Sequence, residues 1–556
     1  MSRRAARGAV LCAAAALAAG AGPSPAAAQS AAAEKADTRA EAVALPSTRP
    51  ERTGFVETSR YADVTAFLDS LAAAVPGLYR RGFGYSEEGR PLPLVVFGVP
   101  AGTPAAEIRA DPRLRVLVLA NIHAGEVAGK EAALALAREL AAGGRDAWLD
   151  SLVVLVAPIY NADGNERIDL RNRPRQHGPL GGMGRRGNAR GLDLNRDNTK
   201  LATAEARSLA RLLVELDPHV LVDLHTTNGT IHGYHLTYAP PLHPGTDPEI
   251  VQELRERWLP AATDSIRARH GEETFHYGNV PGTFGMRGER GWYTFDHRPR
   301  FTTNWAGLRN RFGILSEAYS YATFAERIGA HRHFVTALLD YAARHASRLR
   351  EIVERADAAV RPGREMPLRA TPVRGDTIEV LLGEVREERN PWSGEVILRR
   401  LDVTRSERMP DFTGFEGTDV QALPAAWLLP PDAGDAAARL RAQGIHVRRL
   451  EAAARAAVAR FQLEGARTSE REYEGRHLRD LSGVWRTGTE DLPAGTYVVP
   501  AAQPLGLLAA ILLEPRSDDG FAAWGLVVES DDGVFPVGRA ATDPGGVPLP
   551  EPGAAP

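Results

Sequence analysis

Short apolar runs alternate with helix-like stretches along the chain from about residue 58 to residue 350. The apolar runs are rich in branched side chains, which is typical of strands buried on both faces. They lie at residues 114–120, 152–157, 219–224 and 312–316. Residues 127–144 and 203–216 instead carry the spacing of helices. The alternation predicts an α/β fold with a mainly parallel sheet that helices cover on both sides.

The pattern changes near residue 360. Residues 328–357 read as one long closing helix, and Arg361-Pro362-Gly363 follows it. Beyond this point short extended stretches alternate with Pro, Gly and Asp turns, which is typical of a β-rich unit. We therefore expect a catalytic-type domain over 58–360 and a smaller β-rich domain over 370–545 with one or two helices, notably near 434–461. A disordered tail is expected over 546–556.

The N-terminus has the composition of a secretory signal peptide. Arg3, Arg4 and Arg7 precede a short apolar run over 8–20, and Ala26-Ala27-Ala28 fits a small-residue cleavage site. The apolar run is too short to cross a bilayer, which needs about 20 residues. We predict a signal peptide over 1–28, a flexible leader over 29–57, and a secreted or periplasmic protein with no membrane span.

Composition narrows the choice of chemistry and partners. The net charge of −3 on 556 residues gives no basic surface for nucleic acid or an anionic membrane. The only cysteine, Cys12, falls inside the predicted signal peptide. The mature chain would therefore have no disulfide and no thiolate ligand, so a metal would need His, Asp or Glu.

Three potential metal ligands follow two of the predicted strands. His123 and Glu126 come directly after 114–120, and His225 comes directly after 219–224. Parallel strands end at one edge of a sheet, so we expect these side chains to meet there. Two imidazoles and one carboxylate leave a zinc position open for water. A His-x-x-Glu motif by itself is common, and a loop histidine is the simpler interpretation of it.

Two further motifs carry groups that suit peptide hydrolysis. Asn195 and Arg196 end the stretch Leu-Asp-Leu-Asn-Arg, and Glu317 ends the strand-like run 312–316. An arginine binds a carboxylate through two parallel hydrogen bonds. A carboxylate near water can take its proton and return it to a leaving amine. Taken singly, a surface ion pair for Arg196 and a solvated carboxylate at a strand end for Glu317 are the more common explanations.

The four motifs in this order resemble the zinc carboxypeptidase family, the carboxypeptidase A-like metallopeptidases. The resemblance covers roughly residues 60–350. It implies a three-layer α/β/α fold with a mixed, mostly parallel sheet, one zinc ion per chain, and cleavage of the peptide bond next to a free C-terminus. It also implies roles for individual residues. These are zinc ligation by His123, Glu126 and His225, orientation of His123 by Asp193, carboxylate binding by Asn195 and Arg196, and general base catalysis by Glu317.

Two roles of the family have no clear match in the sequence. Arg173 is our choice for the arginine that stabilises the oxyanion, with Arg171, Arg175 and Arg190 as alternatives in the same Gly- and Arg-rich stretch. Tyr293 is the candidate substrate-binding tyrosine, and Tyr319 and Tyr238 are alternatives. Three further histidines follow the third ligand, and a second metal is a minority interpretation of them. They are His232, His235 and His243.

Other functions remain open. An amidohydrolase of the same fold, acting on N-acyl amino acids or cell-wall peptides, would use the same zinc chemistry. A non-catalytic binding protein is less favoured, because no ligand and no base is missing. The sequence contains neither His-Glu-x-x-His nor Gly-x-Ser-x-Gly. The C-terminal region resembles an extension of some bacterial family members, and the resemblance assigns it no role.

Overall fold

A computed structural model describes residues 45–549. The predicted signal peptide and residues 29–44 of the predicted leader lie outside these residues, as do residues 550–556. The part of the leader that is described contains a short helix, α2 (Arg49–Arg52). Thr48 and Glu51 form a capping box at its start, and Glu51 pairs with Arg138 at 2.6 Å. Residues 45–57 are thus tied to the folded chain by a helix cap and an ion pair.

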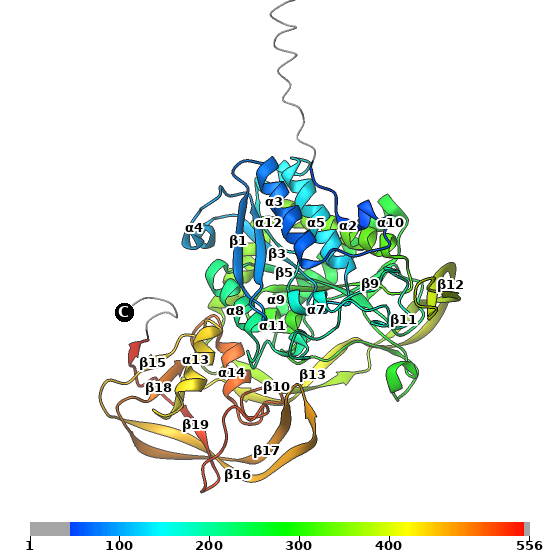
Figure 1. The fold of residues 1–556 in the computed structure, drawn as a ribbon. Coiled ribbons are helices and arrows are strands. Elements are labelled where there is room, and N and C mark those ends of the chain that lie inside the picture. Colours follow the sequence, from blue (N-terminus) through cyan, green and yellow to red (C-terminus); the bar gives the residue numbers. More distant parts are fainter. Residues whose placement is uncertain (1–44, 550–556) are drawn as a thin grey trace, which may run out of the picture. The chain divides into compact units, whose positions relative to one another are not determined.

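An eight-stranded mixed sheet forms the centre of the first 360 residues (Figure 1). Its strand order is β1-β2-β4-β3-β5-β9-β6-β7, and its four central strands β4, β3, β5 and β9 run parallel. The strands are β1 (Tyr79–Tyr85), β2 (Pro91–Phe97), β3 (Leu114–Ala120), β4 (Leu152–Ala157), β5 (Val220–Thr227), β6 (Leu236–Ala239), β7 (Thr274–His276) and β9 (Phe312–Tyr319). The four predicted strands are these central ones, and the predicted fold class is confirmed.

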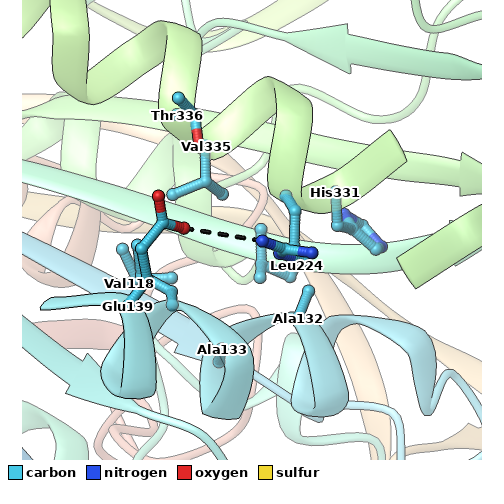
Figure 2. A pocket seen from close by; sticks show the side chains of 10 residues that line it. Val118, Ala132, Ala133, Glu139, Leu224, His331, Val335 and Thr336 are labelled. Carbon is cyan, nitrogen blue, oxygen red and sulfur yellow. Dashed lines mark ion pairs between the residues drawn. The ribbon is translucent and has the colours of Figure 1, made fainter. Parts of the chain in front are cut away.

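Helices cover both faces of this sheet. Successive side chains of a strand point to opposite faces, and β5 shows which helices lie on each. Leu224 lines a small cavity with residues of α5 (Ala128–Ala141) and α12 (Phe324–Ala358), where Glu139 and Arg332 form an ion pair (Figure 2). Leu221 lines a cavity on the other face with residues of α8 (Ala204–Leu216) and α11 (Thr302–Leu308).

Further helices complete this part of the chain. They are α3 (Tyr61–Ala74), α4 (Ala105–Ala110), α6 (Asp146–Leu149), α7 (Ala162–Glu166), α9 (Pro248–Gln252) and α10 (Leu259–His270). The helix predicted over 127–144 ends at Ala141, where Gly143 takes a positive φ of 73° that suits a helix stop. None of the helices between residues 45 and 549 is long and apolar enough to span a membrane.

The chain beyond α12 is mostly antiparallel β-structure, as predicted. It forms a β10–β13 pair, the sheet β11-β12-β8, to which β8 is contributed by the chain before α12, and a seven-stranded sheet of order β17-β16-β19-β14-β18-β15-β20. Strands β16 and β17 make a long hairpin (Figure 1). The strands are β8 (Trp292–Tyr293), β10 (Glu365–Val373), β11 (Thr377–Arg389), β12 (Val396–Phe412), β13 (Gly414–Ala422), β14 (Ala426–Leu429), β15 (Arg448–Arg449), β16 (Ala454–Tyr473), β17 (Arg476–Leu492), β18 (Tyr497–Pro500), β19 (Val534–Ala540) and β20 (Val547–Pro548).

The helices and the tail of this region differ in part from the sequence pattern. The helix expected near 434–461 is shorter: α13 covers Gly434–Ala442, and β16 begins at Ala454. A second helix, α14 (Gly506–Leu513), is buried along its whole length. Residues 547–548 of the expected tail pair with β15. In each case the structure depends on backbone pairing and packing with other elements. These long-range contacts cannot be predicted from the local sequence.

One buried hydrophobic cluster joins the residues before and after position 360. Leu224 of the central sheet, Val360, Trp427 and Leu507 all belong to it. The strands of the two regions also pair directly, since β8 lies parallel to the end of β12. The boundary near 360 therefore separates two kinds of secondary structure that share a core. That the two are distinct domains stays a prediction.

Candidate active site

The carboxyl ends of the central strands bring the predicted site residues together. His123 lies three residues beyond the end of β3. His225 on β5 and Glu317 on β9 are direct register partners in neighbouring parallel strands. The sheet therefore fixes the spacing of these last two side chains, and both face one cavity of about 170 Å³.

Three potential ligand atoms meet at the base of this cavity. The Nδ1 atoms of His123 and His225 are 3.1 Å apart. Glu126 places Oε1 3.1 Å from Nδ1 of His123 and Oε2 3.0 Å from Nδ1 of His225. All three residues are buried. No other group of His, Cys, Asp or Glu of this kind exists within residues 45–549.

Buried carboxylates set the orientation of both imidazoles. Nε2 of His123 is 3.0 Å from Oδ1 of Asp193, and Nε2 of His225 is 2.9 Å from Oδ2 of Asp223. An ionised carboxylate only accepts, so each Nε2 carries the ring proton and each Nδ1 presents a lone pair. Asp223 was not among the predicted residues. It stands two positions before His225 on the same strand, so strand alternation alone would have put it on the same face.

These residues fit a zinc ion. Two lone pairs that face each other at 3.1 Å repel unless a cation lies between them. Tetrahedral zinc with ligands at about 2.0–2.1 Å sets neighbouring ligand atoms about 3.3 Å apart, close to the separations seen here. Each imidazole has a carboxylate on its far nitrogen, which is a common arrangement at zinc sites. Two imidazoles and one carboxylate also leave a position for water or substrate.

A glycine inside the His123–Glu126 turn allows Arg173 to approach the cavity. A Cβ on Gly125 would lie 2.7 Å from Cγ of Arg173 and 2.9 Å from the carbonyl oxygen of Gly184. Arg173 donates from Nη2 to the Thr226 carbonyl at 2.8 Å and pairs with Glu126 at 3.0 Å. The motif thus needs glycine because the Gly- and Arg-rich loop packs directly onto it.

Arg186 is a second arginine of this loop that lines the cavity, and the sequence analysis did not single it out. Its Nη2 lies 2.9 Å from Asp193 and its Nη1 3.4 Å from Glu126. Its side chain is 42% exposed, against 12% for Arg173. The three alternatives named from the sequence line other surfaces. Arg171 approaches Glu395, Arg175 pairs through its backbone with β12, and Arg190 bonds to Glu87 and Ala202.

Asn195 and Arg196 line the other end of the cavity from a short 3-10 helix (Leu194–Arg196). Oδ1 of Asn195 accepts hydrogen bonds from the backbone and the hydroxyl of Thr302. The Arg196 guanidinium stacks 3.8 Å from the centre of the Phe301 ring. Its Nη1 donates to the Asn195 carbonyl at 2.7 Å and its Nε to the Tyr473 hydroxyl at 3.0 Å. Its Nη2 has no acceptor among residues 45–549.

Glu317 presents an unsatisfied carboxylate to the same cavity. Its Oε2 is buried and has no hydrogen-bond partner within the described part of the chain. Burial raises the pKa of Glu317 to about 8, although the neighbouring His225 acts in the opposite direction. A buried carboxylate that nothing in the protein satisfies is suited to bind water or a proton.

The tyrosine that lines the cavity is Tyr277, which the sequence analysis did not consider. It follows β7 directly, and burial raises its pKa to about 12, so its hydroxyl is a neutral donor. Tyr293 lies elsewhere: it stacks on Phe412 at 4.2 Å and donates to the Glu289 carbonyl. Tyr238 and Tyr319 are buried in packing and bond to Thr263 and to the His232 amide. The three-residue strand β7 is too short for its pattern to mark Tyr277.

The three additional histidines take separate places in the fold. His232 stacks on Tyr319, and His235 accepts a hydrogen bond from the Glu273 amide. Nδ1 of His243 accepts from the Gly245 amide. Burial lowers the pKa of His232 and of His243 to about 3, so both are neutral. They join no metal-type cluster within residues 45–549.

An α/β sheet with a buried His-Glu-His group at its carboxyl edge, next to a free carboxylate and exposed guanidinium groups, defines a metallohydrolase. Comparison with known proteins shows which kind of metallohydrolase the chain resembles. Residues 64–210 match the family model described as "Zinc carboxypeptidase". These findings identify the protein as a metallocarboxypeptidase whose residues 64–210 are similar to the zinc carboxypeptidase family.

Individual known proteins are also similar to this chain. The chain is 26% identical over 478 residues to "Carboxypeptidase 2" of Trichophyton tonsurans, covering 83% of this chain and 82% of that protein. It is 30% identical over 196 residues to human "Carboxypeptidase D", covering 30% of this chain and 14% of that protein. A solved carboxypeptidase A from Helicoverpa armigera aligns with a TM-score of 0.39 at 15% identity, over 58% of this chain and 82% of that one.

Proposed function

We propose that this protein removes the C-terminal residue of peptides at a site that holds one zinc ion. The convergence of His123 Nδ1, Glu126 and His225 Nδ1 within 3.1 Å of one another carries the proposal. These three residues would hold the ion. When bound there, zinc would supply Lewis-acid polarisation of the scissile carbonyl and make water acidic enough to lose a proton near neutral pH.

Arg196 and Asn195 would bind the terminal carboxylate of the substrate. The free Nη2 of Arg196 and the remaining hydrogen of its Nη1 form a fork that matches a carboxylate. The Asn195 amide nitrogen has no acceptor within the described residues, while its oxygen is fixed by Thr302. Holding the carboxylate here orients the last peptide bond toward His123, His225 and Glu317, which line the same cavity.

Glu317 would act as the general base and then as the general acid. Its free Oε2 would accept a proton from the attacking water. The same carboxyl group would then donate that proton to the nitrogen of the departing amino acid, so the carboxylate is regenerated at the end of each turnover. A carboxyl whose pKa lies near the working pH suits both transfers.

Arg186 and Arg173 are both placed to stabilise the negative charge that develops on the carbonyl oxygen. Arg173 is the residue that the sequence analysis favours. The structure gives a reason to prefer Arg186, because its side chain is more exposed than that of Arg173. Arg186→Gln is then expected to lower kcat more than Arg173→Gln at saturating zinc.

A direct test measures the metal content of the mature chain and identifies the products by mass. The expected result is about one zinc per chain and release of single C-terminal amino acids from peptides. Peptide amides and N-acyl amino acids are assayed in parallel under the same conditions. Faster cleavage of N-acyl amino acids than of peptides would contradict peptidase action and favour an amidohydrolase of the same fold.

A further inference from the structure

The hairpin β16–β17 of the C-terminal region reaches the segment that contains Asn195 and Arg196, the residues proposed to bind the substrate carboxylate. We call this part of the active site its carboxylate end. Its turn is formed by Tyr473, Glu474, Gly475 and Arg476, with Tyr473 and Arg476 paired. The Tyr473 hydroxyl accepts from Nε of Arg196 at 3.0 Å, and Glu474 Oε2 accepts from the Asp193 amide at 2.8 Å. Neither residue lines the cavity, so they contact substrate-binding residues from behind.

The backbone at this turn is unusual for a glutamate. Glu474 has a φ of 51° and Gly475 a φ of 77°, which is the pattern of a tight two-residue hairpin turn. Gly, Asn and Asp are the residues that favour the first of these positions, and another residue pays conformational energy there. The long side chain of Glu474 reaches the Asp193 amide, which a shorter residue at this position would not do.

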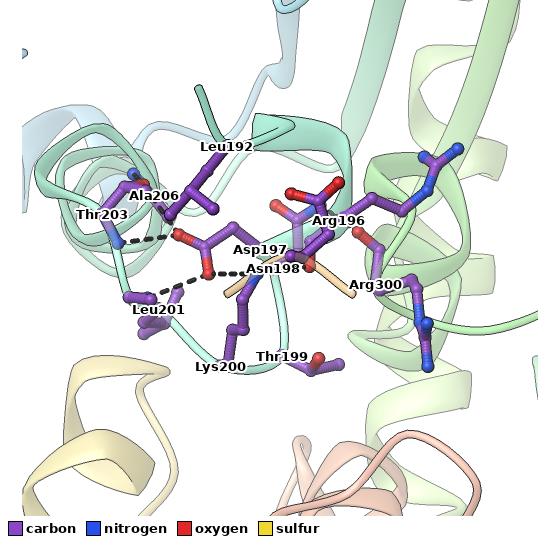
Figure 3. A network of polar contacts seen from close by, with 12 residues as sticks. Leu192, Arg196, Asp197, Asn198, Thr199, Lys200, Leu201, Thr203, Ala206 and Arg300 are labelled. Carbon is purple, nitrogen blue, oxygen red and sulfur yellow. Dashed lines mark hydrogen bonds and ion pairs between the residues drawn. The ribbon is translucent and has the colours of Figure 1, made fainter. Parts of the chain in front are cut away.

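Figure 3 shows the segment that contains Arg196, Asn198 and Thr199. Further residues of the C-terminal region form hydrogen bonds to it. Trp524 donates from Nε1 to the Thr199 hydroxyl at 3.1 Å, and Gln443 donates to the Asn198 carbonyl at 2.7 Å. The Trp524 ring also stacks on the Tyr473 ring. This segment therefore takes its position from groups that lie more than 240 residues later in the chain.

The hairpin limits which donors of the Arg196 guanidinium are available to a ligand. Tyr473 occupies the Nε side, and the Phe301 ring covers one face. The only donors left for a ligand are those at the Nη1 and Nη2 end, which faces the cavity. A carboxylate is thereby restricted to one end-on geometry, which is the geometry needed to place the next peptide bond.

We propose that the C-terminal region is a structural part of the substrate site, in which Tyr473 positions Arg196 and Glu474 positions the Asp193 backbone. Both are positioning residues, because they act through groups that touch substrate or orient His123. The inference rests on the proposed function of Arg196 as the carboxylate-binding residue. It gives the C-terminal region a role in recognition of the substrate terminus.

The first test is Tyr473→Phe, which removes one hydroxyl and keeps the ring that stacks on Trp524. Steady-state kinetics with an N-acetylated dipeptide that ends in leucine should show KM raised about tenfold with kcat nearly unchanged, as for loss of one charge-assisted hydrogen bond. Zinc content and thermal stability should stay as in the wild type. Tyr61→Phe is the matched control, since its hydroxyl bonds only to the Pro91 carbonyl. An unchanged KM in Tyr473→Phe would overturn the role of this hydroxyl.

The second test is Glu474→Gly, which suits the positive φ and removes the acceptor for the Asp193 amide. Hydrogen exchange measured by mass spectrometry should become faster in peptides that cover 190–200 and stay unchanged in the central strands. Glu470→Gly on the same hairpin is the control. Equal exchange in Glu474→Gly and wild type would overturn the proposal, whatever the activity.

The two readouts separate failure of this inference from failure of the proposed function. If the wild type cleaves no peptide, the proposed function fails, and exchange in Glu474→Gly still decides whether the hairpin holds the segment. If the wild type cleaves peptides and exchange rises in Glu474→Gly while its KM does not, the hairpin is structural only and the positioning role is overturned.

Discussion

The two ends of the active site are built in different ways. The metal end stands on the sheet: His225 and Glu317 are register partners on adjacent strands, and His123 follows a third strand closely. The carboxylate end stands on a three-residue helix in a loop, which is fixed by Thr302, Phe301 and Tyr473. Backbone ladders hold the first end, whereas side chains from distant segments hold the second. In the proposed mechanism, the groups that need fixed geometry thus lie on the sheet, and the residues that would recognise the substrate lie on a loop that other parts of the chain can adjust.

The largest expected effect is at the metal end. Glu317→Gln keeps the shape of the side chain and removes its ability to take a proton. We expect kcat to fall by about 10²–10⁴-fold, the usual contribution of general acid–base catalysis. Zinc content, measured by elemental analysis, should not change, because Glu317 is not among the three clustered ligands. Wild-type turnover in this variant would remove Glu317 from the mechanism.

A second substitution tests whether the two ends are separable. Asp223→Asn leaves a neutral amide beside Nε2 of His225, far from the carboxylate-binding residues. Zinc affinity, measured by competition with a chelating dye, should fall about 10–100-fold. At saturating zinc the preference for a free terminal carboxylate over an amide should be that of the wild type. A changed preference would show that the ends are coupled.

The converse variant acts at the other end. Arg196→Lys keeps the charge but loses the planar fork and the bond from Nε to Tyr473. We expect kcat/KM for peptides with a free terminus to fall about tenfold or more, through KM, with little change for peptide amides. Zinc affinity measured with the same dye serves as the internal control. A fall in zinc affinity would contradict the division of the site.

The smallest effect compares two tyrosines. Tyr277→Phe removes a neutral hydroxyl that faces the cavity, and we expect kcat/KM to fall about three- to tenfold. Tyr293→Phe removes a hydroxyl bonded to the Glu289 carbonyl away from the cavity, so activity should stay within about twofold of wild type. The reverse order would restore Tyr293 as the substrate-binding tyrosine and would require the loop around it to move.

The difference between groups on the sheet and groups on loops also explains which features could be predicted from the sequence. The strands and main helices followed from hydrophobic spacing, and His123, Glu126, His225 and Glu317 stood out because each directly follows or ends an apolar run. Parallel strands turn such spacing along the chain into proximity in space. The predictions for β3, β4, β5 and β9 are confirmed by the structure.

Residues outside this regular framework were harder to find. Arg186 and Arg173 share one glycine-rich loop, and only the packing against Gly125 and Thr226 shows how far each is exposed. Tyr277 follows a strand of three residues. Tyr473 and Glu474 come from a hairpin whose approach to the site depends on how two sheets pack. Loop conformation and packing over long sequence distance leave no periodic signal in the sequence.

The shared core across residue 360 affects how an active molecule comes into being. Synthesis proceeds from the N-terminus, so the strands that carry His123, His225 and Glu317 leave the ribosome first. The hairpin that fixes Arg196 follows only after another 156 residues, counted from Glu317 to Tyr473. During that interval the nascent chain would contain the two histidines and Glu317, but Arg196 would not yet be held in position to bind a substrate. A peptidase built in this way gains full selectivity only when nearly its whole length has folded.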